Sequence, residues 1–213
     1  MKLVGLRPFA GRTGLTASRW LSTLAVVASG AVFYLSGRDP SREAVDRAYR
    51  RVVEQARQAV FFIDYRVPDT LDGRFELICL HAFLYLHRLK DDRPQASRFC
   101  QSLFDTMFAD FDRSLREMGV GDLSVGPHVK RMSRAFYGRI IAYEAGLAGD
   151  DSTLTAALAR NMFGTTSVPQ SAVGAMAAYV RDAVGGLRSQ PADDLLAGHV
   201  SFAAPSYLTR KTR

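Results

Sequence analysis

Hydrophobic residues recur every three to four positions through most of the chain after residue 40, a spacing that predicts amphipathic helices and no strand of any length. The clearest example is residues 119–144. One stripe of a helix in this region carries apolar side chains at Val129, Met132, Phe136, Ile140, Tyr143 and Leu147. The opposite side carries Lys130, Arg131 and Arg134. Such a helix buries one face and exposes a cationic one, which is more typical of a binding protein than of an enzyme.

Capping and helix-breaking residues set the expected boundaries of the elements. Ser41 is suited to cap the first helix, and Gly119 to end a long one. We expect residues 61–74 to form a linker in which Pro68 and Gly73 interrupt regular structure. The expected helices cover residues 41–60, 74–90, 95–118, a segment opened by Gly126 and Pro127, a segment from about 150 to 163, and residues 170–188, with a helical turn near 192–197.

These elements predict an all-α fold: a single compact helical domain of about six to seven helices over residues 39–205. Residues 77–87 contain no formal charge and are apolar all the way round. Because this run is too short to cross a bilayer, we expect it to be the central buried helix. A basic, partly hydrophobic arm, residues 1–38, precedes the domain, and a basic tail, residues 206–213, follows it.

The net charge of +7 is concentrated at the two ends of the chain. Residues 1–38 hold five basic residues and no acidic one, and the last four residues hold three more, so residues 39–209 carry about one net negative charge. Proteins that bind duplex DNA usually carry their positive charge on the folded surface. The distribution therefore argues against DNA as a partner.

The arm contains 18 residues without a charge, 20–37. A helix of this length spans roughly 27 Å, slightly less than a hydrocarbon core of about 30 Å. A marginal membrane anchor, a cleaved signal peptide and an extension upstream of the true start are all compatible with the segment. We favour a membrane-associated or loosely ordered arm.

No catalytic or metal-binding constellation stands out from the spacing of polar residues. His81 and His87 are six residues apart and face different sides of a helix, so His81 is expected to be a core histidine. The sequence GVGD at 119–122 is better explained as a helix stop followed by a helix start than as a phosphate loop. Paired aspartates at helix boundaries suit capping, and Cys79 and Cys100 are expected to be reduced. We therefore expect no metal and no cofactor.

Two groups of residues are candidates for partner binding. Lys130, Arg131 and Arg134 suit a solvated face, a membrane-surface patch or a seat for an acidic partner. A second group combines aromatic and basic side chains with a glycine that is costly in a helix interior: Phe136, Tyr137, Gly138, Arg139 and Tyr143. Either a partner or another helix of the same domain can pack against this second group, and both interpretations stay open.

The chain resembles the ubiquinol–cytochrome c chaperone family, the assembly factors of respiratory complex III. The resemblance rests on VPDTLDGRFELICLHAFLYLHRL (67–89), FDTMFADFDRSLREMGVGDLSVG (104–126) and VKRMSRAFYGRIIAYEAGL (129–147), and more loosely on 158–164 and 177–182. These stretches contain the residues that we assign to the structural motif: Asp72, Gly73, Arg74, Phe75, His81, Gly119, Gly121 and Asp122. The chain departs from the family pattern at Pro127 and His128, where the family often has a further basic residue.

The resemblance implies a non-catalytic chaperone that binds newly made cytochrome b and promotes its assembly into complex III. It also implies a place on the cytoplasmic side of a bacterial inner membrane, peripheral or weakly anchored by residues 20–37. The membrane surface, and a ribosome or a small partner subunit, are further expected partners. Two alternatives stay open: a helical enzyme with a site near His81 and Arg74, and an adaptor tethered to the membrane through residues 20–37.

Overall fold

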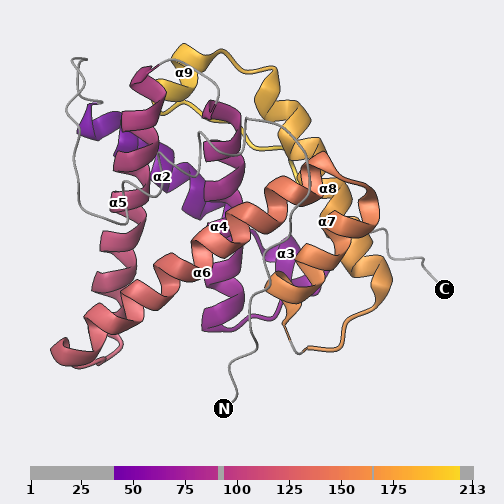
Figure 1. Cartoon of the computed structure of the whole chain (residues 1–213), viewed down its shortest axis with the longest axis horizontal. Coiled ribbons are helices and arrows are strands. Elements are labelled where there is room, and N and C mark those ends of the chain that lie inside the picture. The colour runs from indigo at the N-terminus through magenta and orange to yellow at the C-terminus, as the bar shows by residue number, and fades with distance from the viewer. Residues whose placement is uncertain (1–40, 91–93, 165, 207–213) are drawn as a thin grey trace, which may run out of the picture. The chain divides into compact units, whose positions relative to one another are not determined.

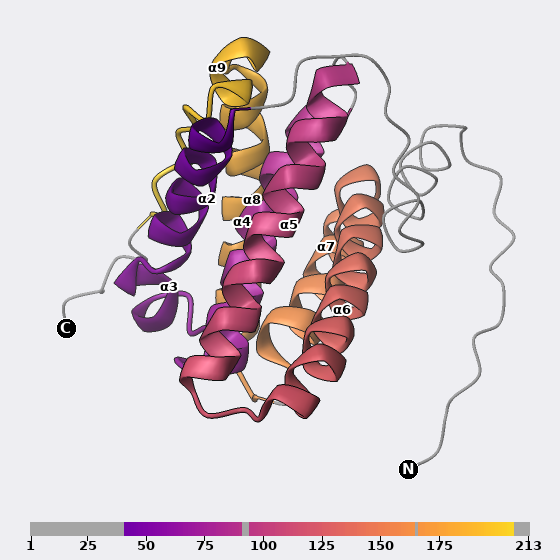
Figure 2. The same cartoon turned by 90° about the vertical axis from the view of Figure 1, so that its left-hand side faces the viewer.

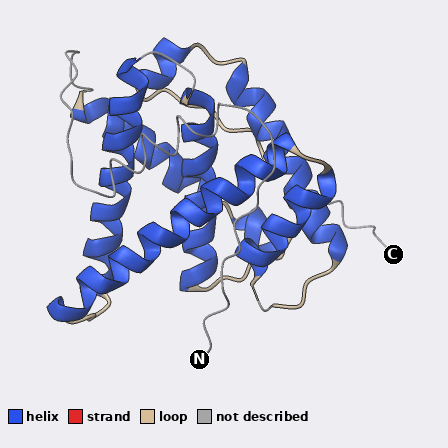
Figure 3. Ribbon diagram, viewed as in Figure 1, coloured by secondary structure: helices blue, strands red, loops and turns tan. Residues whose placement is uncertain are grey.

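The structure is a computed structural model that describes residues 41–90, 94–164 and 166–206. The chain divides into two units, residues 1–36 and 37–213, and all the described residues belong to the second. Those described residues contain helices and loops and no strand (Figure 3). The predicted all-α class is therefore confirmed. The expectations for the arm 1–38, including the possible anchor at 20–37, lie outside the described residues.

Six of the helices in the described part of the chain have eight residues or more, in agreement with the expected six to seven. They are α2 (Arg42–Ala56), α4 (Leu71–Leu89), α5 (Pro94–Glu117), α6 (Asp122–Ala148), α7 (Asp151–Leu158) and α8 (Gln170–Arg188). Shorter elements are α3 (Ala59–Ile63), α9 (Ala192–Leu196) and the π-helical segment η1 (Ala159–Phe163).

Helix α4 occupies the centre, as its uncharged sequence predicts. Every residue from Glu76 to Leu86 is buried, and the helix packs against α2, α5, α6, α8 and η1. Figures 1 and 2 show the resulting three layers. The middle layer contains α4, α5 and α8. On one side of it lie α2, α3 and α9, and on the other side lie α6 and α7. Helix α6 crosses α4 diagonally at the outside of the body (Figure 1).

The start of α4 corrects one prediction, because Gly73 lies inside the helix instead of in a linker. Helix α4 begins at Leu71, and the Thr70 side chain accepts a hydrogen bond from the Gly73 backbone N–H at 3.2 Å. A Cβ at position 73 would overlap the carbonyl oxygen of Pro68. Glycine therefore permits a close approach of two backbone segments here. The preceding helix is also shorter than expected: α2 ends at Ala56, and α3 follows it.

The start of α6 corrects a second prediction. Gly126 and Pro127 do not open this helix, which begins at Asp122 and contains Pro127. Proline leaves the carbonyl four residues before it without its usual donor. That carbonyl belongs to Leu123, whose residue is 95% exposed, so water can satisfy it. The expected helix stop at Gly119 is confirmed, since this residue adopts a φ of 84° and the Val120 N–H donates to the Leu115 carbonyl at 3.0 Å.

His81 is a core histidine, as expected, and it lies within a chain of hydrogen bonds. Gln55 donates to the Tyr179 hydroxyl at 3.0 Å, and that hydroxyl lies 2.7 Å from His81 Nε2. His81 Nδ1 lies 2.7 Å from the Leu77 carbonyl, which only accepts, so Nδ1 carries the proton and Nε2 accepts from Tyr179. Burial lowers the pKa of His81 to about 4.

We predict that His81 makes the fold less stable in acid. The unfolded chain takes up a proton near pH 6.5, whereas the folded chain does so only near pH 4. The stability from neutral His81 is therefore present above pH 6.5 and is lost as the pH falls towards 4, by up to about 3 kcal/mol. Urea unfolding followed by circular dichroism should show that, over this pH range, the free energy of unfolding falls more steeply for the parent than for His81→Gln. Equal slopes would contradict the assignment.

Candidate functional site

The outer face of α6 is the candidate site, because it joins the cationic residues predicted from sequence to exposed apolar ones. We define this face by the exposed residues of one continuous stripe: Leu123, Gly126, Pro127, Lys130, Arg131, Arg134, Gly138, Ile141, Ala145 and Ala148. Its middle part carries three cations, and the exposed residues from 123 to 148 include no carboxylate. Its C-terminal part is uncharged and consists of small residues and Ile141, which is 54% exposed.

The three predicted cations all lie on this face. Lys130, Arg131 and Arg134 are exposed, and none of their side chains forms a hydrogen bond or an ion pair with another described residue. Their charge is therefore available to a partner or to solvent.

Two of the predicted aromatic residues lie in the core instead. Phe136 and Tyr143 are fully buried. The Phe136 ring lies 6.0 Å from that of Phe104, and the Tyr143 ring lies 5.4 Å from that of Phe83. Packing within the domain, one of the two interpretations left open by the sequence, thus accounts for both residues. They offer no surface to a partner in this structure.

Tyr137 lies at the edge of the core, and Gly138 lies on the surface. The half-buried Tyr137 ring stacks on Phe104 at 5.6 Å, and its buried hydroxyl has no hydrogen-bond partner among the described residues. Gly138 is exposed, and a Cβ there would meet no described atom within 4 Å. No helix of the described body therefore explains this glycine, whereas at Gly146 a Cβ would lie 2.7 Å from the Leu154 Cα of α7.

Arg139 turns inward and forms a two-pronged ion pair with Glu76 of α4. The two side chains are only 16% and 6% exposed. Arg139 also donates to the Ala135 carbonyl at 2.8 Å and lies over the Phe75 ring, 5.6 Å from its centre. Burial raises the pKa of Glu76, and the contacts with Arg139 oppose that shift.

The sequence did not single out Glu76. It lies directly before the uncharged run of α4, and a carboxylate at the edge of a buried helix needs a partner. This position indicates that Glu76 needs a partner, but it does not identify Arg139, which lies 63 residues away along the chain.

Most of the structural-motif residues lie at the start of α4 and in the turn that leads into α6. Asp72 lies in the first turn of α4, Arg74 pairs with Asp69 at 2.7 Å, and the Phe75 ring lies 5.2 Å from that of Phe111 on α5. Gly119, Gly121 and Asp122 form the turn into α6, where Asp122 contacts Arg116.

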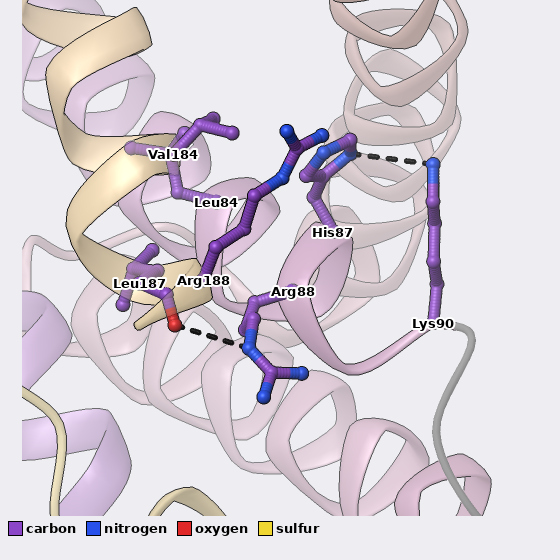
Figure 4. A pocket seen from close by; sticks show the side chains of 7 residues that line it. All are labelled: Leu84, His87, Arg88, Lys90, Val184, Leu187 and Arg188. Carbon is purple, nitrogen blue, oxygen red and sulfur yellow. Dashed lines mark hydrogen bonds between the residues drawn. The ribbon is translucent and has the colours of Figure 1, made fainter. Parts of the chain in front are cut away.

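A small basic cavity lies elsewhere, between the C-terminal ends of α4 and α8 (Figure 4). Its volume is about 250 Å³, and its lining consists of Leu84, His87, Arg88, Lys90, Val184, Leu187 and Arg188. Arg88 donates to the Leu187 and Gln190 carbonyls, both at 3.0 Å, while His87 and Lys90 contact Glu144 at 2.8 and 2.7 Å. Most of these basic groups thus satisfy a helix end or a carboxylate, and the lining includes no serine, threonine or cysteine.

Neither metal ligands nor a spanning segment is found in the described part of the chain. No group of three or more His, Cys, Asp or Glu side chains there is placed to hold a metal ion. None of the helices there combines the length and the apolar composition that crossing a bilayer requires. Cys79 and Cys100 form no disulfide, as expected; Cys79 is buried and Cys100 only partly so.

Residues 64–202 match the profile of the ubiquinol-cytochrome C chaperone family, a segment that contains the whole of α4 to α9. The chain belongs to this family. The fold agrees with that of a family relative, the Cbp3 homolog from Brucella abortus, whose crystal structure superposes with a TM-score of 0.70 at 36% identity and covers 86% of this chain and 97% of that one.

Several curated relatives are named as assembly factors of ubiquinol-cytochrome c reductase. Human ubiquinol-cytochrome c reductase complex assembly factor 1 is 30% identical over 157 residues, which is 73% of this chain and 52% of that protein. The mitochondrial protein CBP3 of Saccharomyces cerevisiae is 32% identical over 107 residues, 49% of this chain and 32% of that protein. The chain thus spans about half the length of the human relative.

We predict that removing one partner of the Glu76–Arg139 ion pair destabilises the fold more than removing both. Arg139→Met should lower the free energy of unfolding by about 3–5 kcal/mol, because it leaves a buried carboxylate unpaired. The double variant Glu76→Leu/Arg139→Met should recover more than half of that loss. Urea unfolding measures both changes, and Arg42→Met, which removes an exposed pair with Asp46, should cost less than about 1 kcal/mol. Additive losses in the double variant would contradict the prediction.

Proposed function

We propose that this protein is a non-catalytic assembly chaperone that binds newly made cytochrome b and promotes its incorporation into ubiquinol–cytochrome c reductase. Family membership supports the assembly role, since its relatives are named as assembly factors of that complex. The outer face of α6 is the observation that carries the client-binding part of the proposal.

The uncharged C-terminal part of this face suits a transmembrane segment of the client. Gly138, Ala145 and Ala148 are small and exposed, and Ile141 is exposed beside them. Small residues let two helix backbones approach closely, and such contacts favour association between apolar helices. Gly138 leaves room for a neighbour that the described body does not supply. The client's apolar surface would cover Ile141.

The cellular setting is part of the same proposal. A chaperone for a membrane-embedded client works at the surface of the membrane that receives the client, so we place this protein peripherally at the cytoplasmic side of the inner membrane. A ribosome and a small partner subunit, both expected from the family resemblance, stay predictions and form no part of this proposal.

A bulky side chain at Gly138 tests client binding without disturbing the core. We predict that Gly138→Phe lowers the recovery of cytochrome b with the tagged protein by at least about fivefold, since a ring there blocks a close helix approach. Gly174→Phe is the matched control, because Gly174 is also an exposed helical glycine with open space around it, on α8. Both variants should keep the parent's circular dichroism spectrum.

The comparison between the two variants decides the outcome. Loss of cytochrome b with Gly138→Phe and parental recovery with Gly174→Phe support the client face. Parental recovery with both variants, or equal losses with both, would contradict it.

A further inference from the structure

The turn between α5 and α6 exposes two large aliphatic side chains. Leu123 is 95% exposed and Met118 is 52% exposed. This turn lies at the end of the described body opposite α9 (Figures 1 and 2). Single exposed apolar residues are common on proteins, so the neighbouring charges decide what these two imply.

Beyond the turn, the exposed charged side chains on the outer face of α6 are positive. Lys130 and Arg134 follow Leu123 by seven and eleven residues on the same stripe of the helix, and Lys130 is thus about 10 Å further along the axis. At the turn itself, Asp122 contacts Arg116, which also pairs with Asp112 at 2.6 Å. Apart from Glu117, whose side chain is exposed, the acidic groups at the turn are therefore paired.

Exposed aliphatic side chains beside exposed cations are the surface chemistry of a helix that lies at a membrane interface. Its apolar side chains enter the boundary between headgroups and acyl chains, while lysine and arginine reach the phosphates. RNA fits this surface less well, because single-stranded RNA is bound by cations interleaved with exposed aromatic rings. The large exposed hydrophobic residues of the described chain are Ile63, Leu71, Met118, Leu123 and Ile141, and none is aromatic.

We propose that the α5–α6 turn and the cationic part of α6 form a contact site for anionic phospholipids, with Leu123 entering the interface and Lys130, Arg131 and Arg134 contacting headgroup phosphates. This inference rests on the proposed function and deepens it, because it orients the chaperone on the membrane. The client-binding part of the outer face, from Gly138 onwards, then follows directly along the same helix.

A tryptophan placed at the turn reports on this contact by itself. The chain has one tryptophan, Trp20, so the full-length Trp20→Phe/Leu123→Trp variant emits only from position 123. Vesicles of phosphatidylcholine with phosphatidylglycerol should shift this emission to the blue, and brominated acyl chains should quench it. Trp20→Phe/Ile63→Trp is the control, since Ile63 is 57% exposed on α3, which Figure 1 shows well apart from the turn.

Charge reversal tests the headgroup contacts. In the tryptophan-123 background, Lys130→Glu/Arg134→Glu should weaken binding to the anionic vesicles by at least about tenfold. Arg42→Glu/Arg50→Glu removes the same charge from exposed positions on α2 and should change binding by less than about twofold.

The outcomes separate this inference from the proposed function, because no client is present. The lipid site is supported if the emission of the tryptophan at position 123, and not of that at position 63, shifts to the blue and is quenched. This response should be lost when the charges of Lys130 and Arg134 are reversed. An unchanged emission at position 123, equal responses at positions 123 and 63, or a response to RNA without one to vesicles would overturn it. The recovery of cytochrome b with Gly138→Phe is a separate experiment, so the proposed function can stand or fail independently of the vesicle results.

Discussion

The ion pair between Glu76 and Arg139 fixes which face of α6 turns inward. Both charges lie in the interior, where an unpaired carboxylate or guanidinium is costly. Helix α6 therefore cannot rotate about its axis without separating them. With Arg139 held over Phe75, the stripe of Phe136, Ile140 and Tyr143 enters the core, and the opposite stripe has to face outward.

The function proposed for this chain follows from that outward stripe. Helix α6 packs with its inner side against α4, α5 and α7, and its outer side presents lysine and arginine followed by small apolar residues. This order along one helix suits a body that rests on a charged membrane surface and holds an apolar client beside it. The basic cavity at the ends of α4 and α8 suits helix capping better than chemistry, because most of its charged side chains already have partners.

Local patterns predicted most of the fold, and contacts between distant segments account for what they missed. Periodicity identified the buried stripe of α6, and the uncharged run identified α4 as the central helix. The inward turn of Arg139 depends on Glu76, which no local pattern links to it. The start of α4 depends on the backbone of Pro68 passing close to Gly73, and α6 tolerates Pro127 because Leu123, four residues before it, is exposed to solvent. In the candidate site the cations were predicted, whereas Leu123 and Ile141 were not, because sequence does not reveal which apolar residues are left uncovered.

We infer that this protein acts by holding another protein and not by converting a substrate. The most direct measurement is the amount of cytochrome b and of assembled ubiquinol–cytochrome c reductase in cells lacking the protein, by haem spectra and native gels. Both amounts should fall together and be restored by a plasmid copy of the gene, with no small metabolite accumulating. Normal levels of the complex in these cells, together with an accumulated metabolite, would contradict it.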